Sequence, residues 1–278
     1  MASIPAGGFT MGDFLDGETD AIPSITVYVS TFYMDTNLVS NSQWQSVYNY
    51  ATNQGYGFVN AGGGSKTNNP VVQVDWYDTV KWCNARSQQA GLIPIYYTDA
   101  GMTQVYTNGE TTNVFAKWTA NGYRLPTEAE WEKAARGGLF GQRFPWGNTI
   151  SESQANYVGD TNDYSYDLGP NGSNILFTNG ASPHTSPVGY FAPNNYGLYD
   201  MAGNVFVWCW DWYAAPPYPA GSPYLGGSDP RGPASGSTRA LRCGSWIFDA
   251  SYSRCASRSE TDLTTTHSGL GFRCVREH

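Results

Sequence analysis

Apolar residues recur at helical spacing, i, i+3 and i+4, in three stretches of the chain: residues 40–54, 75–91 and 127–136. Ser40 and Asp75 stand where N-caps are needed, and Gly91 can end the second stretch in a left-handed conformation. In the third stretch, Thr127 and Glu130 have the spacing of a capping box. The pattern therefore predicts three amphipathic helices.

The remaining apolar residues alternate only over short runs, which predicts short strands separated by long connections. The expected strands are residues 4–11, 27–34, 203–210, 241–246 and 270–275. Two stretches, residues 162–184 and 214–237, are rich in Pro, Gly, Ser and Asn, but Tyr and Leu recur in them. We therefore expect packed loops there. The whole pattern predicts an α+β chain with little regular secondary structure.

Composition indicates a folded, loop-rich protein. The 278 residues include 32 Gly and 16 Pro, while aromatic residues make up 15% and can bury enough surface to order long loops. Lys and Arg number 15 against 23 Asp and Glu, and this net charge of −8 excludes broad binding of nucleic acid. No run of about 18 apolar residues predicts a membrane span.

The five cysteines allow at most two disulfides and leave one thiol over, so they do not decide the cellular compartment. The N-terminus lacks the basic-then-apolar pattern of a signal peptide and begins directly on the first expected strand. We therefore expect any export signal of this protein to be absent from the sequence.

Seven short motifs follow one another along the chain: IPAGGFTMG (residues 4–12), GYRLPTEAEWE (122–132), FPWGN (144–148), NYGLYDMAGNV (195–205), GSW (244–246), RCASR (254–258) and GFRC (271–274). Their sequences and their order resemble the signatures of the formylglycine-generating enzyme (sulfatase-modifying factor) family. Because they span nearly the whole chain, the resemblance implies a single domain over residues 1–278. It also implies the C-type-lectin fold in the form that this family adopts.

The residues do not match the chemistry of the family. The resemblance implies that a copper-dependent enzyme carries two cysteines, five positions apart, where this chain has IFDASYS (247–253). Cuprous copper and thiol oxidation both need thiolates, which Ser, Tyr and Asp do not supply. Related sulfoxide synthases use histidine-ligated iron, but His184, His267 and His278 lack ligand-like spacing. We therefore expect no copper, no catalytic residue and no enzymatic activity.

The resemblance also implies a calcium site around Asp200, Gly203 and Val205. The family continues with a Glu where this chain has Val207, and valine cannot bind calcium. A second oxygen-rich cluster at residues 156–160 leaves calcium open, although turn preferences favour ordinary turn formers there.

One disulfide, between Cys83 and Cys274, is implied by the resemblance alone. The residue that the family pairs with Cys255 falls at Ala135 in this chain. Cys209 and Cys243 are extra relative to the family, and we expect them to be buried thiols.

The C-terminal part resembles a further branch of the same fold, the variable proteins of diversity-generating retroelements, such as those of treponemes. RALRCGSW (239–246) and LGFR (270–273) flank scattered small and aromatic residues, and the resemblance implies a variable region at residues 241–273. Adenine-directed mutagenesis of an AAC codon yields residues such as Ser, Thr, Tyr, Asp, His, Phe and Ile. Most of residues 247–267 agree with that rule, but Glu260 does not.

The expected ligand-binding residues are Trp246, Ile247, Phe248, Asp249, Ser251, Tyr252, Ser253, Ser257, Ser259, Thr261, Asp262, Thr264, Thr265, Thr266 and His267. Tyr offers rigid contact area and Ser, Thr and Asp offer adaptable hydrogen bonds, as in antibody paratopes. The alternative is that Ile247 and Phe248 are core residues of a strand and the Thr run is a solvated loop. For Arg254 and Arg258, and for the carboxylates of residues 127–131, structural roles are favoured.

The sequence thus predicts a non-enzymatic bacterial protein that binds a protein or another macromolecule. We expect it outside the cell or at the cell surface as a lipoprotein, meeting a membrane only through a removed N-terminal lipid anchor. The first alternative is a formylglycine-generating-type oxidase acting on cysteine peptides through unrecognised residues. The second is an interaction domain with an invariant surface.

Overall fold

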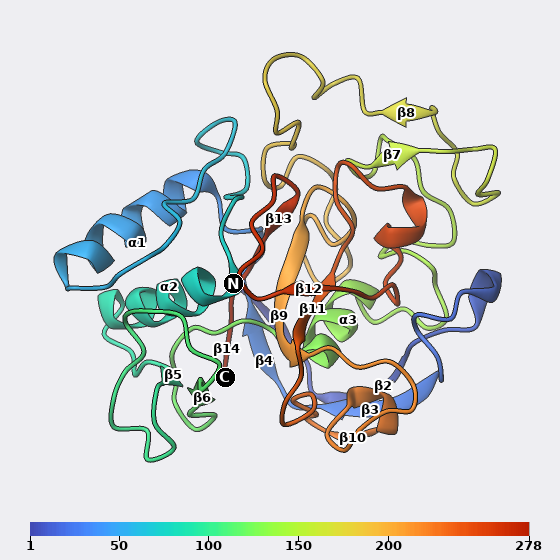
Figure 1. The fold of residues 1–278 in the computed structure, drawn as a ribbon. Coiled ribbons are helices and arrows are strands. Elements are labelled where there is room, and N and C mark those ends of the chain that lie inside the picture. The colour runs from blue at the N-terminus through green and yellow to red at the C-terminus, as the bar shows by residue number, and fades with distance from the viewer. Residues whose placement is uncertain (278) are drawn as a thin grey trace.

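The computed structural model describes residues 1–277, in which the first two α-helices lie at one edge of the molecule and the third lies among the short strands (Figure 1). The helices are α1 (Asn41–Asn53), α2 (Trp76–Gln89) and α3 (Glu128–Arg136). The strands are β1 (Ala2–Ile4), β2 (Gly7–Met11), β3 (Ile25–Val29), β4 (Phe32–Met34), β5 (Tyr96–Tyr97), β6 (Phe115–Ala116), β7 (Val158–Gly159), β8 (Gly172–Ser173), β9 (Phe206–Trp212), β10 (Gly227–Ser228), β11 (Thr238–Arg242), β12 (Ser259–Asp262), β13 (Leu270–Gly271) and β14 (Val275–Glu277). Single 3₁₀ turns are η1 (Leu15–Gly17), η2 (Pro223–Leu225) and η3 (Ala250–Ser253). The predicted α+β class with little regular secondary structure is confirmed.

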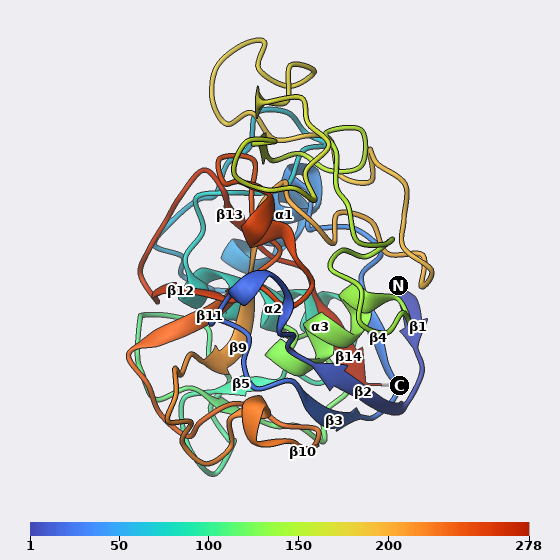
Figure 2. The same ribbon diagram turned by 90° about the vertical axis from the view of Figure 1, so that its right-hand side faces the viewer.

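The central sheet has the strand order β12-β11-β9-β13. Within it, β9 pairs antiparallel with β11 and parallel with β13. The strands β1 and β14 flank β4, so the two ends of the described chain lie in one small sheet (Figures 1 and 2). Helix α3 contacts β2 and β3 on one side and β9 and β11 on the other, whereas α1 and α2 lie against each other. The third helix therefore sits where the central sheet meets the sheet of β10, β3 and β2.

The predicted helix caps are confirmed. The Ser40 hydroxyl accepts the N–H of Gln43, and the Asp75 carboxylate accepts the N–H of Asp78. At α3 the Thr127 hydroxyl and the Glu130 carboxylate accept each other's backbone N–H groups, which satisfies two donors that a helix start leaves free.

Several strand predictions are wrong in their boundaries. Pro5, which has no N–H to donate, separates β1 from β2, and the expected strand at residues 27–34 is divided between two sheets. The strand expected at residues 241–246 ends at Arg242, because Cys243 and Gly244 have φ values of 94° and 71°, which a strand does not accommodate. This early end turns the following residues out of the sheet.

The loop expectation is wrong for part of residues 162–184. Leu168, Ile175 and Leu176 are exposed, with 63%, 71% and 60% of their surface accessible. Tyr166, in contrast, is buried in a small aromatic cluster with Phe144. This loop is thus packed near its start and open beyond it.

Glu128, the first residue of α3, is fully buried and pairs with two arginines from the C-terminal part of the chain. Its Oε1 lies 2.5 Å from Nε of Arg258 and 3.4 Å from Nη1 of Arg242. Burial alone raises the pKa of this carboxyl, but the two guanidinium groups outweigh it and hold the pKa below its usual range. Glu128 therefore stays charged and ties α3 to β11 and to the segment after η3.

Glu132, one turn further along α3, extends the same network. It pairs with Arg136 at 2.6 Å and with Arg242, and it accepts the backbone N–H of Gly12 at 2.8 Å. Arg254 is held separately, by Asp20 at 3.0 Å. The structural roles expected for Arg254, Arg258 and the carboxylates of α3 agree with these contacts.

All five cysteines are buried free thiols. The sulfur atoms of Cys83 and Cys274 lie 3.6 Å apart, so the fold brings the two predicted partners together. A disulfide needs a separation of about 2.05 Å, and the bond between them therefore stays a prediction. Cys209 and Cys243 are buried, as expected.

Replacing Glu132 with Gln should lower the free energy of unfolding by about 3–5 kcal/mol, because Arg242 then loses a carboxylate partner in a buried site. Urea denaturation followed by circular dichroism measures this loss. Glu260→Gln is the matched control, since Glu260 is exposed, and its effect should stay within about 0.5 kcal/mol. Equal effects of the two substitutions would contradict the role given to Glu132.

Candidate binding face

Trp246 anchors the start of the expected variable segment. Its backbone N–H donates to the carbonyl of Asn204 and its indole Nε1 donates to the carbonyl of Ser268, each at 3.0 Å. The His184 ring packs edge-on against it, with ring centroids 5.2 Å apart. Only 9% of the Trp246 surface is exposed, so this side chain supports the segment from the interior of the protein. Its prediction as a contact residue is corrected.

Phe248 and Tyr252 form a half-buried aromatic pair, with ring centroids 4.7 Å apart. Both rings pack edge-on against Phe206, the first residue of β9, at 5.2 and 6.1 Å. Phe206 was not predicted as part of the site. The alternation Phe206, Trp208, Trp210 along the strand is the sequence signal that places it on the same side as the neighbouring tryptophans.

Asp249 shapes the turn that presents this pair. Its Oδ1 accepts the backbone N–H of Ser251 at 2.9 Å and the Ser251 hydroxyl at 2.6 Å, which caps η3. The backbone N–H of Val158 donates to the carbonyl of Phe248 at 2.9 Å. The main chain of residues 248–251 is therefore held by hydrogen bonds and by a cap within the turn itself.

The second half of the segment begins with β12, an edge strand that pairs antiparallel with β11. Glu260 and Asp262 point out from it, and such charges discourage pairing with another chain. β12 crosses the near side of the molecule in Figure 1 and lies at the left edge in Figure 2, so both views place it on the outside.

Beyond β12 the loop is fixed by its backbone and one buried side chain. Leu263 is 6% exposed, and its carbonyl accepts the N–H of Trp76 at 3.0 Å. The N–H of Gln73 donates to the carbonyl of His267 at 3.2 Å. Gln73 and Trp76 were not predicted to take part, and no local sequence signal marks them. The intervening residues Thr264 and Thr266 are exposed.

The structure joins the two halves at the start of β9. The N–H of Phe206 donates to the carbonyl of Gly269 at 2.8 Å, and Trp246 bonds Ser268 next to it. We call the exposed and half-buried members of the expected set the binding face: Ile247, Phe248, Asp249, Ser251, Tyr252, Ser259, Thr261, Asp262, Thr264, Thr265, Thr266 and His267.

Two further expected residues do not belong to this face. Ser253 is fully buried and Ser257 is 5% exposed, because η3 and the Arg254–Arg258 segment turn them toward the interior. The alternative interpretation fails in one respect, since Ile247 and Phe248 are half-buried residues of a turn and not of a strand.

The segment that the resemblance linked to calcium is filled by protein groups. The Cys243 thiol donates to the carbonyls of Asp200 and Gly203 at 3.3 and 3.2 Å, and Arg273 donates to the Asp200 carbonyl at 3.0 Å. Burial raises the pKa of the Asp200 carboxyl. Oxygens already paired with donors beside a guanidinium do not fit a divalent cation.

The second cluster, at residues 156–160, shows turn geometry. Oδ1 of Asp160 accepts the backbone N–H groups of Asn162 and Asp163, at 3.0 and 3.2 Å. The amide of Asn156 donates to the carbonyl of His184. Over residues 1–277, no group of three His, Cys, Asp or Glu side chains is arranged to hold a metal ion.

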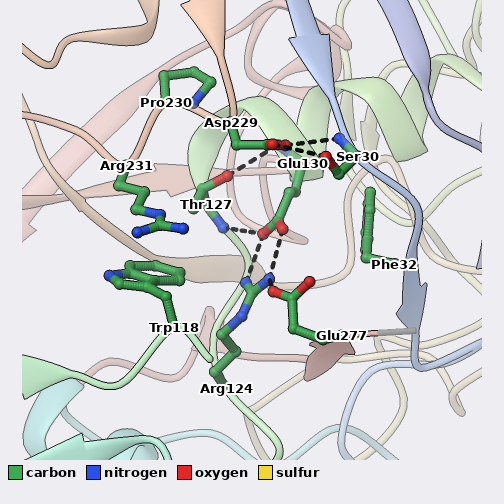
Figure 3. A pocket seen from close by; sticks show the side chains of 10 residues that line it. All are labelled: Ser30, Phe32, Trp118, Arg124, Thr127, Glu130, Asp229, Pro230, Arg231 and Glu277. Carbon is green, nitrogen blue, oxygen red and sulfur yellow. Dashed lines mark hydrogen bonds and ion pairs between the residues drawn. The ribbon is translucent and has the colours of Figure 1, made fainter. Parts of the chain in front are cut away.

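A polar pocket of 110 Å³ lies on another part of the surface (Figure 3). Arg124 lies between Glu130 and Glu277 in it, 2.7 Å from each. Because these three charges satisfy one another, the pocket is explained as an ion-pair network that fastens the start of α3 to β14.

Comparison with known protein families gives the class of this protein. The family model described as "Sulfatase-modifying factor enzyme 1-like domain" matches residues 1–278, and the chain belongs to that family. It is 33% identical over 297 residues to the formylglycine-generating enzyme of Mus musculus, with all of this chain and 75% of that protein covered.

Two further proteins extend the comparison. The structure of Treponema denticola variable protein 1 is similar, with a TM-score of 0.76 and 29% identity over all of this chain and 95% of that one. The predicted resemblance to the variable-protein branch of the fold is thereby confirmed. "Chaperone protein LppX" of Paenibacillus barcinonensis is 35% identical over 206 residues, which is 69% of this chain and 66% of that protein.

None of the helices within residues 1–277 has the length and apolar surface that a membrane-spanning helix requires.

Asp75 precedes Trp76, whose N–H bonds the carbonyl of Leu263, and its carboxyl gives a pH-dependent prediction. Burial, and then Asp78, raises the pKa of Asp75 from 3.8 to about 7, so the folded protein holds a proton that the unfolded chain releases. The stability that this proton confers is present below about pH 4 and is lost as the pH rises to about 7. Across this window, Asp75→Asn should become steadily more stable relative to the parent protein. Urea denaturation of both proteins at several pH values measures this difference in the free energy of unfolding.

The control for this experiment is Asp99→Asn. Asp99 is exposed, and hydrogen bonds from Gln104 and Thr103 lower its pKa, so its substitution should give a constant offset over the same window. A constant offset for Asp75→Asn as well would contradict the prediction.

The binding face should tolerate substitution. Thr264→Tyr and Thr266→Tyr each should change the free energy of unfolding by no more than about 0.5 kcal/mol, because these side chains are exposed. Ser253→Tyr should cost about 1–3 kcal/mol or more by overpacking a buried position. Thermal or chemical denaturation distinguishes the two groups, and similar losses in both would contradict the boundary drawn for the face.

Proposed function

We propose that this protein is a non-enzymatic binder whose binding face recognises a protein or another macromolecular ligand and is diversified by a retroelement. The similarity to a variable protein over the whole chain supports this function. The decisive observation is that the main chain of residues 246–269 is held mostly by groups other than the side chains it presents.

Most supports of this main chain lie outside the binding face; the exceptions are the Asp249 carboxylate, which accepts the N–H of Ser251, and Nδ1 of His267, which accepts the N–H of Gly269. The supports outside the face are the backbone groups of Gln73, Trp76, Val158, Asn204 and Phe206, together with the buried side chains of Trp246 and Leu263. A segment fixed in this way can exchange its outward side chains and keep its shape. A protein that varies its contact residues on a rigid scaffold needs the supports of the main chain to be separate from those contact residues.

The composition of the binding face suits a large ligand. Phe248 and Tyr252 provide a half-exposed aromatic pair already fixed against Phe206, which lowers the entropy cost of contact. Hydroxyl and carboxylate groups surround the pair. An exposed aromatic pair within a polar surround is typical of interfaces with macromolecules.

The positions and the raised pKa values of the cysteines argue against the oxidase alternative. Residues 247–253 contain no cysteine, and burial raises the pKa of the Cys243 and Cys255 thiols to about 12 and raises that of the Cys209 thiol well above its usual value. Such thiols are protonated near neutral pH and are poor nucleophiles and poor copper ligands. The relatives named as formylglycine-generating enzymes keep this alternative worth a direct assay.

We place the protein at the bacterial cell surface as a lipoprotein. The similarity to a variable protein and to a protein named LppX supports this location. A face that binds foreign macromolecules is useful only where it meets them.

Sequencing the genomic locus tests the proposal. We expect a near-identical copy of the segment encoding residues 241–273 beside a reverse-transcriptase gene, with mismatches confined to template adenines. Isolates should then differ almost only at the binding face. Invariant tails in many isolates would overturn diversification.

A copper assay tests the enzyme alternative separately. Incubation of the protein with a cysteine-containing peptide, cuprous copper and oxygen should yield no aldehyde product by mass spectrometry, because no reactive thiolate pair is available. The formylglycine-generating enzyme of Mus musculus is the positive control. Aldehyde formation above the level of free copper would overturn the non-enzymatic assignment.

A further inference from the structure

A second hollow, of 570 Å³, opens at the other end of β9. Trp210, Trp212 and Phe115 form its apolar walls, and Arg231 and Arg239 also line it. Its volume lies in the range of small-molecule sites. Phe206, which carries the aromatic pair of the binding face, is at the opposite end of the same strand, about 20 Å away at the usual rise of a strand.

The wall of this pocket is preformed. The loop of residues 231–236 approaches β9 so closely that a Cβ on Gly232 would lie 2.8 Å from Cβ of Asp211, and a Cβ on Gly236 would lie 2.9 Å from Cβ of Trp212. Only glycine permits these approaches, and Gly232 also has a φ of 79°. The loop is therefore fixed against the strand.

Arg239 is enclosed between tryptophan rings. Its Cζ lies 3.9 Å from the Trp76 ring centroid and 3.6 Å from that of Trp212, so the two rings cover opposite faces of the guanidinium. Trp210 lies 5.0 Å away at the side. Only 2% of Arg239 is exposed. Because the rings cover both faces of the guanidinium, only its edge, where the N–H groups point, is available to hydrogen-bond partners.

Arg239 has no counter-ion. Its one hydrogen bond within residues 1–277 runs from Nη1 to the carbonyl of Trp210, and its buried Nε has no partner. Among the other arginines with equally buried side chains, Arg124, Arg242 and Arg254 pair with carboxylates and Arg273 donates to three carbonyls, although Nε of Arg124, Arg242 and Arg273 is unpartnered as well. Arg239, with a single hydrogen bond and no carboxylate, is the least engaged of these buried cations within residues 1–277.

The nearest acid does not fill this role. Asp211 lies between Trp210 and Trp212 in sequence, so its side chain points to the opposite face of β9, where Oδ2 accepts the N–H of Glu128. Burial and the Glu128 charge raise the pKa of Asp211 well above its usual value. Burial also lowers the pKa of Arg239 to about 9, and an anion in the pocket would reverse that shift.

A second cation stands at the rim of the pocket. The Arg231 guanidinium lies 4.2 Å from the Trp118 ring centroid, and Figure 3 shows the two side by side. Arg231 is exposed and makes no hydrogen bond or ion pair within residues 1–277. The pocket thus has one unpaired cation inside and another at its opening.

We propose that this pocket binds a carboxylate carried on a small apolar or aromatic body. The carboxylate pairs with Nη2 of Arg239, which like the buried Nε has no protein partner, and with Arg231 at the rim. The body lies against Trp210, Trp212 and Phe115. A singly charged planar group fits because Arg239 has only Nη2 and the buried Nε left to donate, whereas a phosphate dianion needs more donors.

The same chemistry exists in a free organic acid and in the C-terminal residue of a peptide. Phenylacetate is the probe for the first and a short peptide ending in Phe with a free carboxylate for the second. Phenylacetamide and the C-amidated peptide are the uncharged controls. Binding is followed by the indole N–H signals of the protein in ¹H–¹⁵N NMR spectra, which also report whether the fold is intact.

At least one acid should bind about tenfold more tightly than its amide, as expected for a charge-assisted hydrogen bond. Preference for phenylacetate assigns the site to a free acid, and preference for the peptide assigns it to a C-terminus. Both support the carboxylate site. Equal affinity of acid and amide, or no signal shift at millimolar concentration of either acid, would overturn it.

Two variants locate the site. Arg239→Gln should abolish the preference for the acid, but a buried substitution can disturb folding. Arg231→Gln changes only an exposed side chain and should weaken the acid severalfold without changing the affinity for the amide. Lys66→Gln, which removes an exposed charge elsewhere, is the matched control. Equal weakening by Arg231→Gln and Lys66→Gln would overturn the assignment of this pocket.

Discussion

The buried ion pairs of α3 are the interaction on which the rest of the structure depends. Glu128 and Glu132 connect the helix to β11 through Arg242, to the segment after η3 through Arg258, and to the end of β2 through Gly12. Loss of one partner leaves a charge in a site without water, which is far more costly than loss of a surface pair. A chain with so little regular secondary structure therefore obtains its rigidity from side-chain charges in the interior.

This rigidity explains how the C-terminal segment can act as a binding face. Residues 246–269 begin next to Arg242 and contain Arg254 and Arg258, so the segment is fastened at its start and in its middle by the same interior charges. Between these points, backbone hydrogen bonds from other loops hold the main chain. Apart from Asp249 and His267, which bond the main chain of the segment, most outward side chains therefore have no structural role. The family resemblance implies that the enzymes carry their reactive cysteines in the corresponding interval, so under the proposed function one scaffold position serves two kinds of function.

The strand β9 organises both sites that the surface offers. Its alternation places Phe206 under the aromatic pair at one end and Trp210 and Trp212 around Arg239 at the other. Asp211, on the opposite face, meets α3. One strand therefore couples the interior charge network, the binding face and the tryptophan-lined pocket.

The sequence by itself determined what depends on neighbouring residues: the three helices, with the caps at Ser40, Asp75 and Thr127, and the family through its ordered motifs. Capping and helical periodicity act over a few residues, so they are visible in one dimension. The tertiary structure alone decided which expected contact residues face outward. Ser253 is buried and Thr264 is exposed, although both are small hydroxyl residues in a loop, because the distant anchors at Asp20 and Gln73 set the path of the chain. Contacts between residues so far apart in sequence follow from packing, which no local pattern records.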